Sequence, residues 1–253
     1  MMGSLKAKRT IGGALVFGRG LLSAQLKGQT KGFGKAVIVA AGVSDSSELQ
    51  FSAFLREQIL LTKALRLGRP VIYFGSLGAE PLSEVRYYRH KYRAERRIIR
   101  ASKRNWVFCL PQVFGQAGNS HTLVNYFFSK IAEGKLPPLQ SNVFRLLIPV
   151  SYIPHLSAAF SNSSLGRRVS VLHNAALTPG HLLAILKSEY TGSAVMAPRD
   201  SPFARAFALR RSEREKGRRA YVLRLVNLER LESELRAYVR AKKFDPRLNH
   251  SRL

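Results

Sequence analysis

A tyrosine and a lysine stand four residues apart in the segment that begins Tyr87-Tyr88 and ends at Lys91. On a helix, residues at that spacing lie on one face, one turn apart. The ammonium group of Lys91 would then lower the pKa of the Tyr87 phenol, which is ordinarily about 10. The hydroxyl of Ser76, which ends the preceding apolar run, could complete a hydrogen-bonded group that moves a proton at neutral pH. Because this spacing also arises by chance on basic helices, its meaning depends on the elements around it.

A glycine-rich turn precedes this segment near the start of the chain. The pattern Gly18-x-Gly20-x-x-Ser23 follows the apolar run 13–17 and opens a short helix-like stretch, which is the context of the dinucleotide-binding fingerprint. Gly18 would permit the tight turn, Gly20 would let a pyrophosphate approach the backbone, and Ser23 is small enough for close packing. A glycine-rich turn that binds no ligand accounts for these residues equally well.

The half of such a site that holds adenosine is abbreviated. No Asp or Glu lies between Ser23 and the apolar run at Ala36, so the acidic residue that usually binds the adenosine ribose is missing. That interval is also too short for a further strand and helix. Arg19 and three lysines would suit a 2′-phosphate, although flexible surface lysines account for them too; the lysines are Lys27, Lys31 and Lys35. The sequence therefore leaves NAD and NADP open as the cofactor.

Apolar runs alternate with helix-like segments over the first half of the chain. Strands are predicted at 13–17, 36–41, 71–74 and 106–110, and helices at 48–66, 83–102 and 122–133. Residues 111–115 are predicted to form a loop. The alternation predicts an α/β fold, a Rossmann-like doubly wound parallel sheet with right-handed connections and an abbreviated first half.

The pattern loosens after Pro137-Pro138, where we place a domain boundary. We expect an N-terminal extension at 1–12, a Rossmann-like NAD(P)-binding domain at 13–136, and a smaller, irregular substrate lobe with a charged C-terminal helix at 137–253. In this lobe, residues 143–150 are apolar, a short strand is predicted at 169–172, and helices are predicted at 178–190 and 227–243. The first of these helices has proline at its first helical position.

The chain is strongly basic, with 42 Lys and Arg against 15 Asp and Glu and a formal net charge of +27. The excess is concentrated from Arg86 to Arg104 and from Arg205 to Arg252. It would attract polyanions such as nucleic acid or phosphorylated substrates. Nucleic-acid binding is possible but not favoured, because no zinc-finger spacing, RNP-like motif or helix-turn-helix pattern accompanies the charge. The basic N-terminus resembles a targeting peptide, but Gly18-Arg19-Gly20 interrupts its apolar stretch, so targeting ranks second.

The other reactive residue types exclude several classes of protein. The single cysteine, Cys109, lies in an apolar run and is predicted to be a buried strand thiol, which fits a reducing, cytoplasmic compartment. The histidines show no metal-ligand spacing, carboxylates are too few for a metal cage, and His90 is expected to point away from Tyr87. No G-x-S-x-G elbow supports serine hydrolysis, and no apolar run is long enough to cross a bilayer.

The order of these features resembles the extended short-chain dehydrogenase/reductase superfamily. It is most similar to the NAD-dependent nucleotide-sugar epimerase/dehydratase family of surface-polysaccharide biosynthesis. The resemblance is carried by the glycine turn, the Ser-ended strand followed by Y-x-x-x-K, and two further segments, Ala40-Ala41-Gly42-Val43-Ser44-Asp45-Ser46 and Pro111-Gln112-Val113-Phe114-Gly115. It covers residues 13–190 and is strongest over 37–133.

This resemblance implies a role for each matching residue. Tyr87 would be the acid/base tyrosine, Lys91 would bind the nicotinamide ribose, and Ser76 would hydrogen-bond the substrate oxygen. Gln112 would contact the substrate and Arg145 would bind its nucleotide phosphate. The cofactor would lie against Gly18, Arg19, Gly20, Ser23, Ala41 and Gly42. The implied reaction is an epimerisation, dehydration or oxidoreduction of a nucleotide sugar.

The chain also departs from this family. Family members usually carry acidic residues where this chain has Pro149, Ser151 and Tyr152. The alternative is therefore a degenerate, non-catalytic Rossmann-fold protein that binds a cofactor or other proteins, and nucleic-acid binding ranks third. Tyr88 is the alternative tyrosine, although its spacing to the lysine misses the motif. A homodimer is possible, but arginines on the Tyr/Lys helix would repel one another in such a pair; they are Arg93, Arg96, Arg97 and Arg100.

Overall fold

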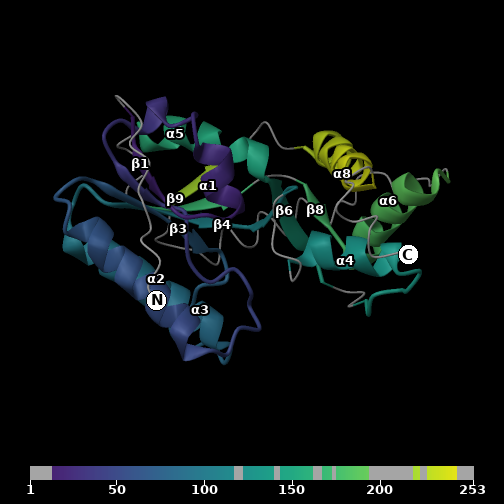
Figure 1. Cartoon of the computed structure of the whole chain (residues 1–253), viewed down its shortest axis with the longest axis horizontal. Helices are drawn as coiled ribbons and strands as arrows, with labels where there is room; N and C mark the ends of the chain where they lie inside the picture. The colour runs from purple at the N-terminus through teal and green to yellow at the C-terminus, as the bar shows by residue number, and fades with distance from the viewer. Residues whose placement is uncertain are drawn as a thin grey trace. The chain divides into compact units, whose positions relative to one another are not determined.

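The structure is a computed structural model that describes residues 13–116, 122–139, 143–161, 167–172, 175–193, 219–222 and 227–243. The chain forms two compact units, each built from several segments (Figure 1). Unit 1 consists of Met1–Leu110, Val150–Val171 and Arg218–Tyr221, and unit 2 consists of Pro111–Pro149, Leu172–Gly217 and Val222–Leu253. Within the described ranges, no helix has the length and apolar character that crossing a membrane requires.

Unit 1 is built on a six-stranded sheet. Its strands are β1 (Leu15–Phe17), β2 (Val37–Val39), β3 (Val71–Ser76), β4 (Trp106–Leu110), β7 (Arg168–Leu172) and β9 (Arg219–Val222). They are arranged in the order β1-β2-β3-β4-β7-β9, and the pairs from β1 to β7 are all parallel. The predicted parallel α/β sheet is confirmed. The predicted burial of Cys109 is confirmed as well, because this residue lies in β4 and is 1% exposed.

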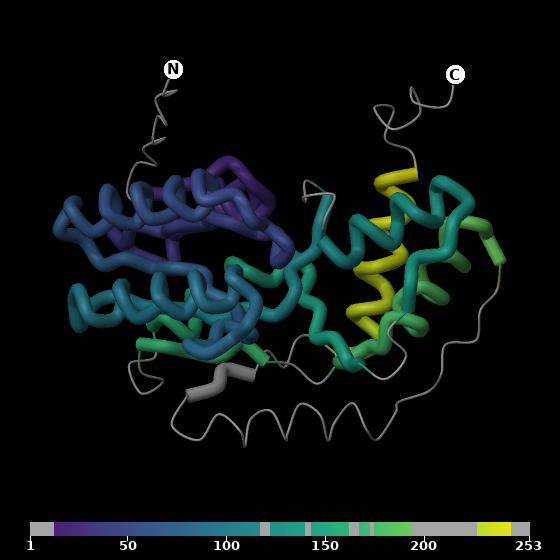
Figure 2. The backbone as a smooth tube through the Cα atoms, turned by 90° about the horizontal axis from the view of Figure 1, so that it is seen from below, coloured from purple at the N-terminus to yellow at the C-terminus, as the bar shows by residue number. Residues whose placement is uncertain are grey.

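Helices cover both faces of this sheet. They are α1 (Leu21–Leu26), η1 (Lys31–Phe33), α2 (Phe51–Leu65), α3 (Arg86–Ala101), η2 (Val150–His155) and α5 (Leu156–Phe160), where η marks a 3-10 helix. On one face α2 and α3 lie side by side (Figure 2). On the other face α1 and α5 pack with η1 and η2 (Figure 1). The sheet is therefore doubly wound in the sense that helices cover both of its faces.

The first crossover connection differs in hand from the next two. Strands β1, β2 and β3 each connect to the next strand in the same direction across the sheet. Because α1 lies on the opposite face from α2 and α3, the β1–α1–β2 connection has the opposite hand to the two that follow (Figure 1). The expectation that all these connections are right-handed is therefore wrong. The interval between α1 and β2 is short and contains η1 alone among the described elements.

The spacing of buried side chains explains why α2 and α3 pack on the sheet. The buried residues of α2 recur every three or four positions, with one adjacent pair, and are Ala53, Phe54, Glu57, Leu61 and Ala64. Those of α3 follow the same spacing and are Lys91, Ala94, Glu95 and Ile98. Such spacing gathers side chains on one helical face. Each buried face contains a carboxylate, so each must find polar partners inside the fold.

In the described residues, unit 2 combines a small sheet with three helices. Its elements are β5 (Gln112–Phe114), α4 (Leu123–Ala132), β6 (Arg145–Pro149), β8 (Ala176–Leu177), α6 (Pro179–Thr191) and α8 (Leu228–Lys243). Strand β6 pairs with β5 in parallel and with β8 in antiparallel orientation. The predicted start of α6 is confirmed, since the Thr178 hydroxyl accepts a hydrogen bond from the backbone N–H of His181 and Pro179 takes the first helical position.

Two predictions about organisation differ from the structure. Residues 111–115 were predicted to form a loop, but they contain β5, whose extended conformation depends on pairing with the distant β6. The boundary predicted at residue 137 does not coincide with the division into units, which falls after Leu110. Residues beyond 137 return to the main sheet as β7, which pairs with β4. The predicted extension at 1–12 lies outside the described residues.

Strand β1 forms one edge of the sheet. In doubly wound folds a dinucleotide lies where the strand order reverses. Here the order runs from β1 to β4 without a reversal, and in the described part of the chain no strand lies beyond β1. The abbreviated first half that the sequence predicts is therefore a structural feature, and the scaffold that would hold an adenosine is reduced to the edge of β1.

We predict that the two glycines of the first turn differ in their tolerance of a methyl group. Gly18 has a φ of +145°, and a Cβ there would collide with the Ala40 carbonyl oxygen, so Gly18→Ala should reduce the free energy of unfolding by about 2 kcal/mol or more. Gly20→Ala is the matched control, because a Cβ at that position would meet no atom within 4 Å, and it should cost less than about 1 kcal/mol. Urea unfolding measures both, and equal losses would contradict this account of the turn.

Candidate functional site

Ser76, Tyr87 and Lys91 come together at the carboxyl end of β3. Ser76 is the last residue of β3, and Tyr87 lies near the start of α3, where the Ser76 side chain lowers the pKa of its phenol. The Lys91 ammonium nitrogen lies 5.6 Å from the centre of the Tyr87 ring. Tyr87 is half-buried and packs against the apolar cluster of Val43, Ala53 and Phe54. The three side chains singled out by the Y-x-x-x-K spacing and the Ser-ended strand therefore form one cluster.

A buried carboxylate, Glu57 of α2, organises this cluster. Its Oε1 accepts hydrogen bonds from the Lys91 ammonium at 2.9 Å and from the Tyr73 hydroxyl at 2.5 Å. Its Oε2 accepts one from the backbone N–H of Val43 at 3.0 Å and lies 3.1 Å from Nε2 of His90. Glu57 thus joins α2 to α3, to β3 and to the segment after β2.

The charges of this pair stabilise each other. Burial would raise the pKa of Glu57, but the Lys91 charge and the hydrogen bonds from His90, Tyr73 and Lys91 outweigh it and lower the pKa to about 2. Burial would lower the pKa of Lys91, but the Glu57 carboxylate outweighs it and raises that pKa. At neutral pH both groups are therefore ionised inside the protein.

The phenol of Tyr87 is held in its protonated form. Burial raises its pKa above the usual 10, and the Glu57 carboxylate raises it further, whereas the Lys91 charge and the Ser76 hydrogen bond lower it. We expected Lys91 to lower this pKa below its usual value. Lys91 does act in that direction, but the net shift is upward because burial is the larger effect and Glu57 offsets the ammonium charge.

A second buried carboxylate, Glu95 of α3, supports the end of β3. Its Oε1 accepts a hydrogen bond from the backbone N–H of Ser76 at 3.2 Å. Its Oε2 accepts two from the Arg168 guanidinium of β7, at 2.9 and 2.6 Å. Gly75 leaves room for this carboxylate, since a Cβ there would collide with it. Glu95 therefore fixes the distance between the strand that carries Ser76 and the helix that carries Tyr87.

The predicted cofactor residues lie at the carboxyl ends of β1 and β2. Gly18 packs against Ala40, and the Ser23 hydroxyl donates a hydrogen bond to the Gly20 carbonyl at 2.9 Å. Arg19 is exposed and Ala41 is half-buried. Gly42 has a φ of +145° and leaves room for the Glu57 carboxylate, with which a Cβ would collide. The glycine turn therefore contacts the end of β2, and the segment after β2 contacts Glu57, which binds Lys91. These residues and Tyr87 follow one another along the carboxyl edge of the sheet.

The nicotinamide half of a dinucleotide fits this edge better than the adenosine half. A pyrophosphate could approach the backbone at Gly20, where no side chain intrudes within 4 Å of the Cβ position. An ammonium group has three donors, and within the described residues Lys91 donates one hydrogen bond, to Glu57. Beyond β1, the described residues provide neither a strand nor the usual acidic residue for the adenosine ribose.

The predicted substrate residues belong to unit 2. Gln112 is the first residue of β5 and is exposed, and Arg145 is the first residue of β6 and is half-buried. They lie on paired strands, with Gln112 opposite Leu147 in the register. Tyr88, the alternative tyrosine, packs edge-on against Tyr87 with the ring centres 5.1 Å apart.

Searches with the sequence and with the structure give different outcomes. No protein-family model matches the chain, and no curated protein sequence matches it. UDP-N-acetylglucosamine 4-epimerase from Methanobrevibacter ruminantium M1 matches in structure with a TM-score of 0.54 and 15% identity, over 82% of this chain and 76% of that chain. UDP-glucose 4-epimerase from Thermus thermophilus, solved with NAD, matches with a TM-score of 0.55 and 16% identity, over 81% and 76%. The chain has the Rossmann-like fold of the UDP-sugar epimerases.

A third structure extends this comparison. The Bordetella bronchiseptica enzyme WbmF, solved with NAD+ and UDP, matches with a TM-score of 0.55 and 15% identity, over 89% of this chain and 77% of that chain. At 15–16% identity, these structures confirm the predicted Rossmann-like fold of this chain.

Sequence reasoning missed the buried acids and two of their partners. Glu57 and Glu95 were not singled out, Tyr73 was assigned only to a strand, and His90 was expected to contribute little. A signal was present, because each glutamate interrupts a stripe of apolar residues on its helix. A charged residue in such a stripe predicts a buried ion pair.

We predict that removing one charge of the Glu57–Lys91 pair lowers the free energy of unfolding more than removing both charges. Glu57→Gln leaves the Lys91 ammonium buried without its counter-ion, and should lower the free energy of unfolding by about 3–5 kcal/mol. The double variant Glu57→Gln/Lys91→Met removes both charges and should recover a large part of that loss. Urea unfolding at neutral pH measures the three proteins, and a double variant less stable than Glu57→Gln would contradict the pairing.

The same pair should make stability depend on pH. The pKa of Glu57 in the folded protein is about 2, below the usual 4.5, so its stabilising effect is complete above pH 4.5 and is lost as the pH falls toward 2. Between neutral pH and pH 2, the wild type should lose about 3 kcal/mol more than Glu57→Gln/Lys91→Met. Parallel losses in the two proteins would show that Glu57 does not titrate as this site requires.

Proposed function

We propose that the chain is an NAD(P)-dependent epimerase/dehydratase or oxidoreductase that acts on a nucleotide sugar. The observation that carries this proposal is the cluster of Ser76, Tyr87 and Lys91 at the carboxyl edge of a Rossmann-like sheet. In open α/β sheets, ligands bind beyond the carboxyl ends of the strands. The UDP-sugar epimerases that share the fold make UDP-sugars the first substrates to test.

In this reaction the phenol of Tyr87 moves the proton of a sugar hydroxyl. The chemistry that a bound nicotinamide supplies is hydride transfer. The raised pKa keeps the Tyr87 oxygen protonated at neutral pH, so this group is ready to donate a proton to a carbonyl oxygen. In the opposite direction, the Lys91 charge lowers the cost of forming the phenolate. The Ser76 hydroxyl orients the phenol and the reacting oxygen.

The remaining predicted residues would hold the ligands. The backbone at Gly18, Gly20, Ala41 and Gly42 would line the cofactor, with Arg19 and Ser23 beside it. Lys91 would use its remaining donors for the nicotinamide ribose. Gln112 would contact the sugar and Arg145 the nucleotide phosphate, and the positive charge of the chain would favour the diphosphate of such a substrate. From the resemblance to the nucleotide-sugar epimerase/dehydratase family, we also propose that the reaction belongs to polysaccharide biosynthesis and takes place in the cytoplasm.

A second candidate is a non-catalytic Rossmann-fold protein that binds a cofactor or another protein. The Glu57 ion pair favours it, because the Lys91 ammonium already has a buried partner at 2.9 Å. The position of β1 at the sheet edge favours it as well, since a full dinucleotide site would extend past that edge. Only the first candidate would turn over a nucleotide sugar, so a turnover assay distinguishes the two.

We predict that Tyr87→Phe lowers kcat by about 10²–10⁴-fold, because it removes the proton-transfer group while keeping the ring. The matched control is Tyr88→Phe, which keeps the edge-on ring contact and should change kcat little. Incubation with NAD and a panel of UDP-sugars, followed by chromatography of the sugar nucleotides, measures turnover. Wild-type turnover by the Tyr87→Phe protein would refute the catalytic assignment, and absence of turnover in the wild type would favour the non-catalytic candidate.

A further inference from the structure

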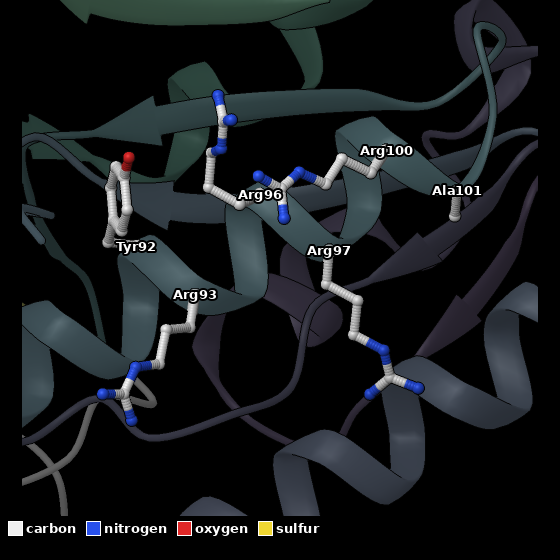
Figure 3. A pocket seen from close by; sticks show the side chains of 6 residues that line it. All are labelled: Tyr92, Arg93, Arg96, Arg97, Arg100 and Ala101. Carbon is white, nitrogen blue, oxygen red and sulfur yellow. The ribbon is translucent and has the colours of Figure 1, made fainter.

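The outer face of α3 carries a cluster of arginines that the proposed reaction does not use. A hollow of about 570 Å³ lies along this helix, and its lining is Tyr92, Arg93, Arg96, Arg97, Arg100 and Ala101 (Figure 3). A second hollow of about 360 Å³ adjoins it between α2 and α3 and shares Arg93. Tyr87 stands near the start of α3, and Arg96 lies about 14 Å further along the helix axis.

These arginines have little to neutralise them. Six arginines lie on α3, and its one carboxylate, Glu95, is buried and bound by Arg168. Arg93, Arg96 and Arg100 are exposed, and among the described residues no acidic side chain pairs with them. Like charges three or four residues apart destabilise a helix. A face that served only solubility would mix both signs of charge.

The cluster combines planar cations with aromatic rings. Arg97 is fixed by hydrogen bonds to Gln58 and Thr62 of α2, which joins the two helices into one face. Tyr92 borders the arginines on α3, and Phe51 of α2, which is 66% exposed, lines the second hollow. Guanidinium groups bind phosphates in a bidentate manner, and exposed aromatic rings stack on bases.

We propose that the face formed by α2 and α3 binds single-stranded nucleic acid, with Arg93, Arg96 and Arg100 on phosphates and Phe51 and Tyr92 stacked on bases. A basic surface that alternates with aromatic rings is the general form of such sites. Double-stranded DNA fits less well, because two packed helices of about 10 Å diameter each are wider than the major groove of about 12 Å.

The test measures binding of a fluorescein-labelled single-stranded RNA of mixed sequence by fluorescence anisotropy at several salt concentrations. The variant Arg93→Ala/Arg96→Ala/Arg100→Ala should bind at least about tenfold more weakly, and its slope of log K against log salt should be shallower by about 2. The matched control, Lys27→Ala/Lys31→Ala/Lys35→Ala, removes the same charge from exposed residues in the segment containing η1, on the other face of the sheet, and should bind within about threefold of wild type.

Further variants distinguish binding at this face from attraction by net charge. Phe51→Ala/Tyr92→Ala should weaken binding by about tenfold without changing the salt slope, because stacking does not release counter-ions. Tyr87→Phe should bind RNA as the wild type does. Equal weakening by the arginine and lysine variants would overturn the proposal, because it would indicate attraction by net charge alone. Equal competition by an acidic polypeptide or by duplex DNA would overturn it too, and melting temperatures near wild type show that each variant is folded.

Discussion

Glu57 places an ionised carboxylate in the interior of unit 1, where it accepts hydrogen bonds from Lys91, Tyr73 and the backbone of Val43 and contacts His90. A buried charge of this kind is tolerated only while its partners stay in place. Those partners come from α3, from β3 and from the segment after β2. The position of α3 on the sheet, and with it the proximity of Tyr87 to the end of β3, therefore depends on satisfying this one group.

This interaction also limits the chemistry of the site. Burial raises the pKa of Tyr87, and the carboxylate that holds Lys91 offsets the charge that would lower it, so the phenol stays protonated at neutral pH. On the proposed function, this site would donate a proton first. The inner face of α3 is balanced by buried acid, whereas its outer face is basic without acid among the described residues. On the two proposals above, one helix would serve two ligands of different chemistry.

Much of unit 1 could be predicted from local patterns. Strand β4 has the predicted bounds, and the apolar runs that precede α2 and α3 are β2 and β3, so Ser76 and Tyr87 could be placed together. The ion-pair partner of Lys91 could not be predicted from the sequence, because Glu57 is 34 residues away and its burial depends on how two helices pack. Pairings between distant segments, such as β5 with β6 and β7 with β4, leave no local signal either.

We propose that the carboxyl edge of β1, β2 and β3 binds a nicotinamide cofactor although the adenosine half of the site is abbreviated. Calorimetric titration with NAD, NADP and nicotinamide mononucleotide tests it most directly. Saturable binding of NAD or NADP is predicted, with the mononucleotide within about tenfold in affinity, because few described residues remain to hold the adenosine. No binding of any of the three at millimolar concentration would contradict the claim.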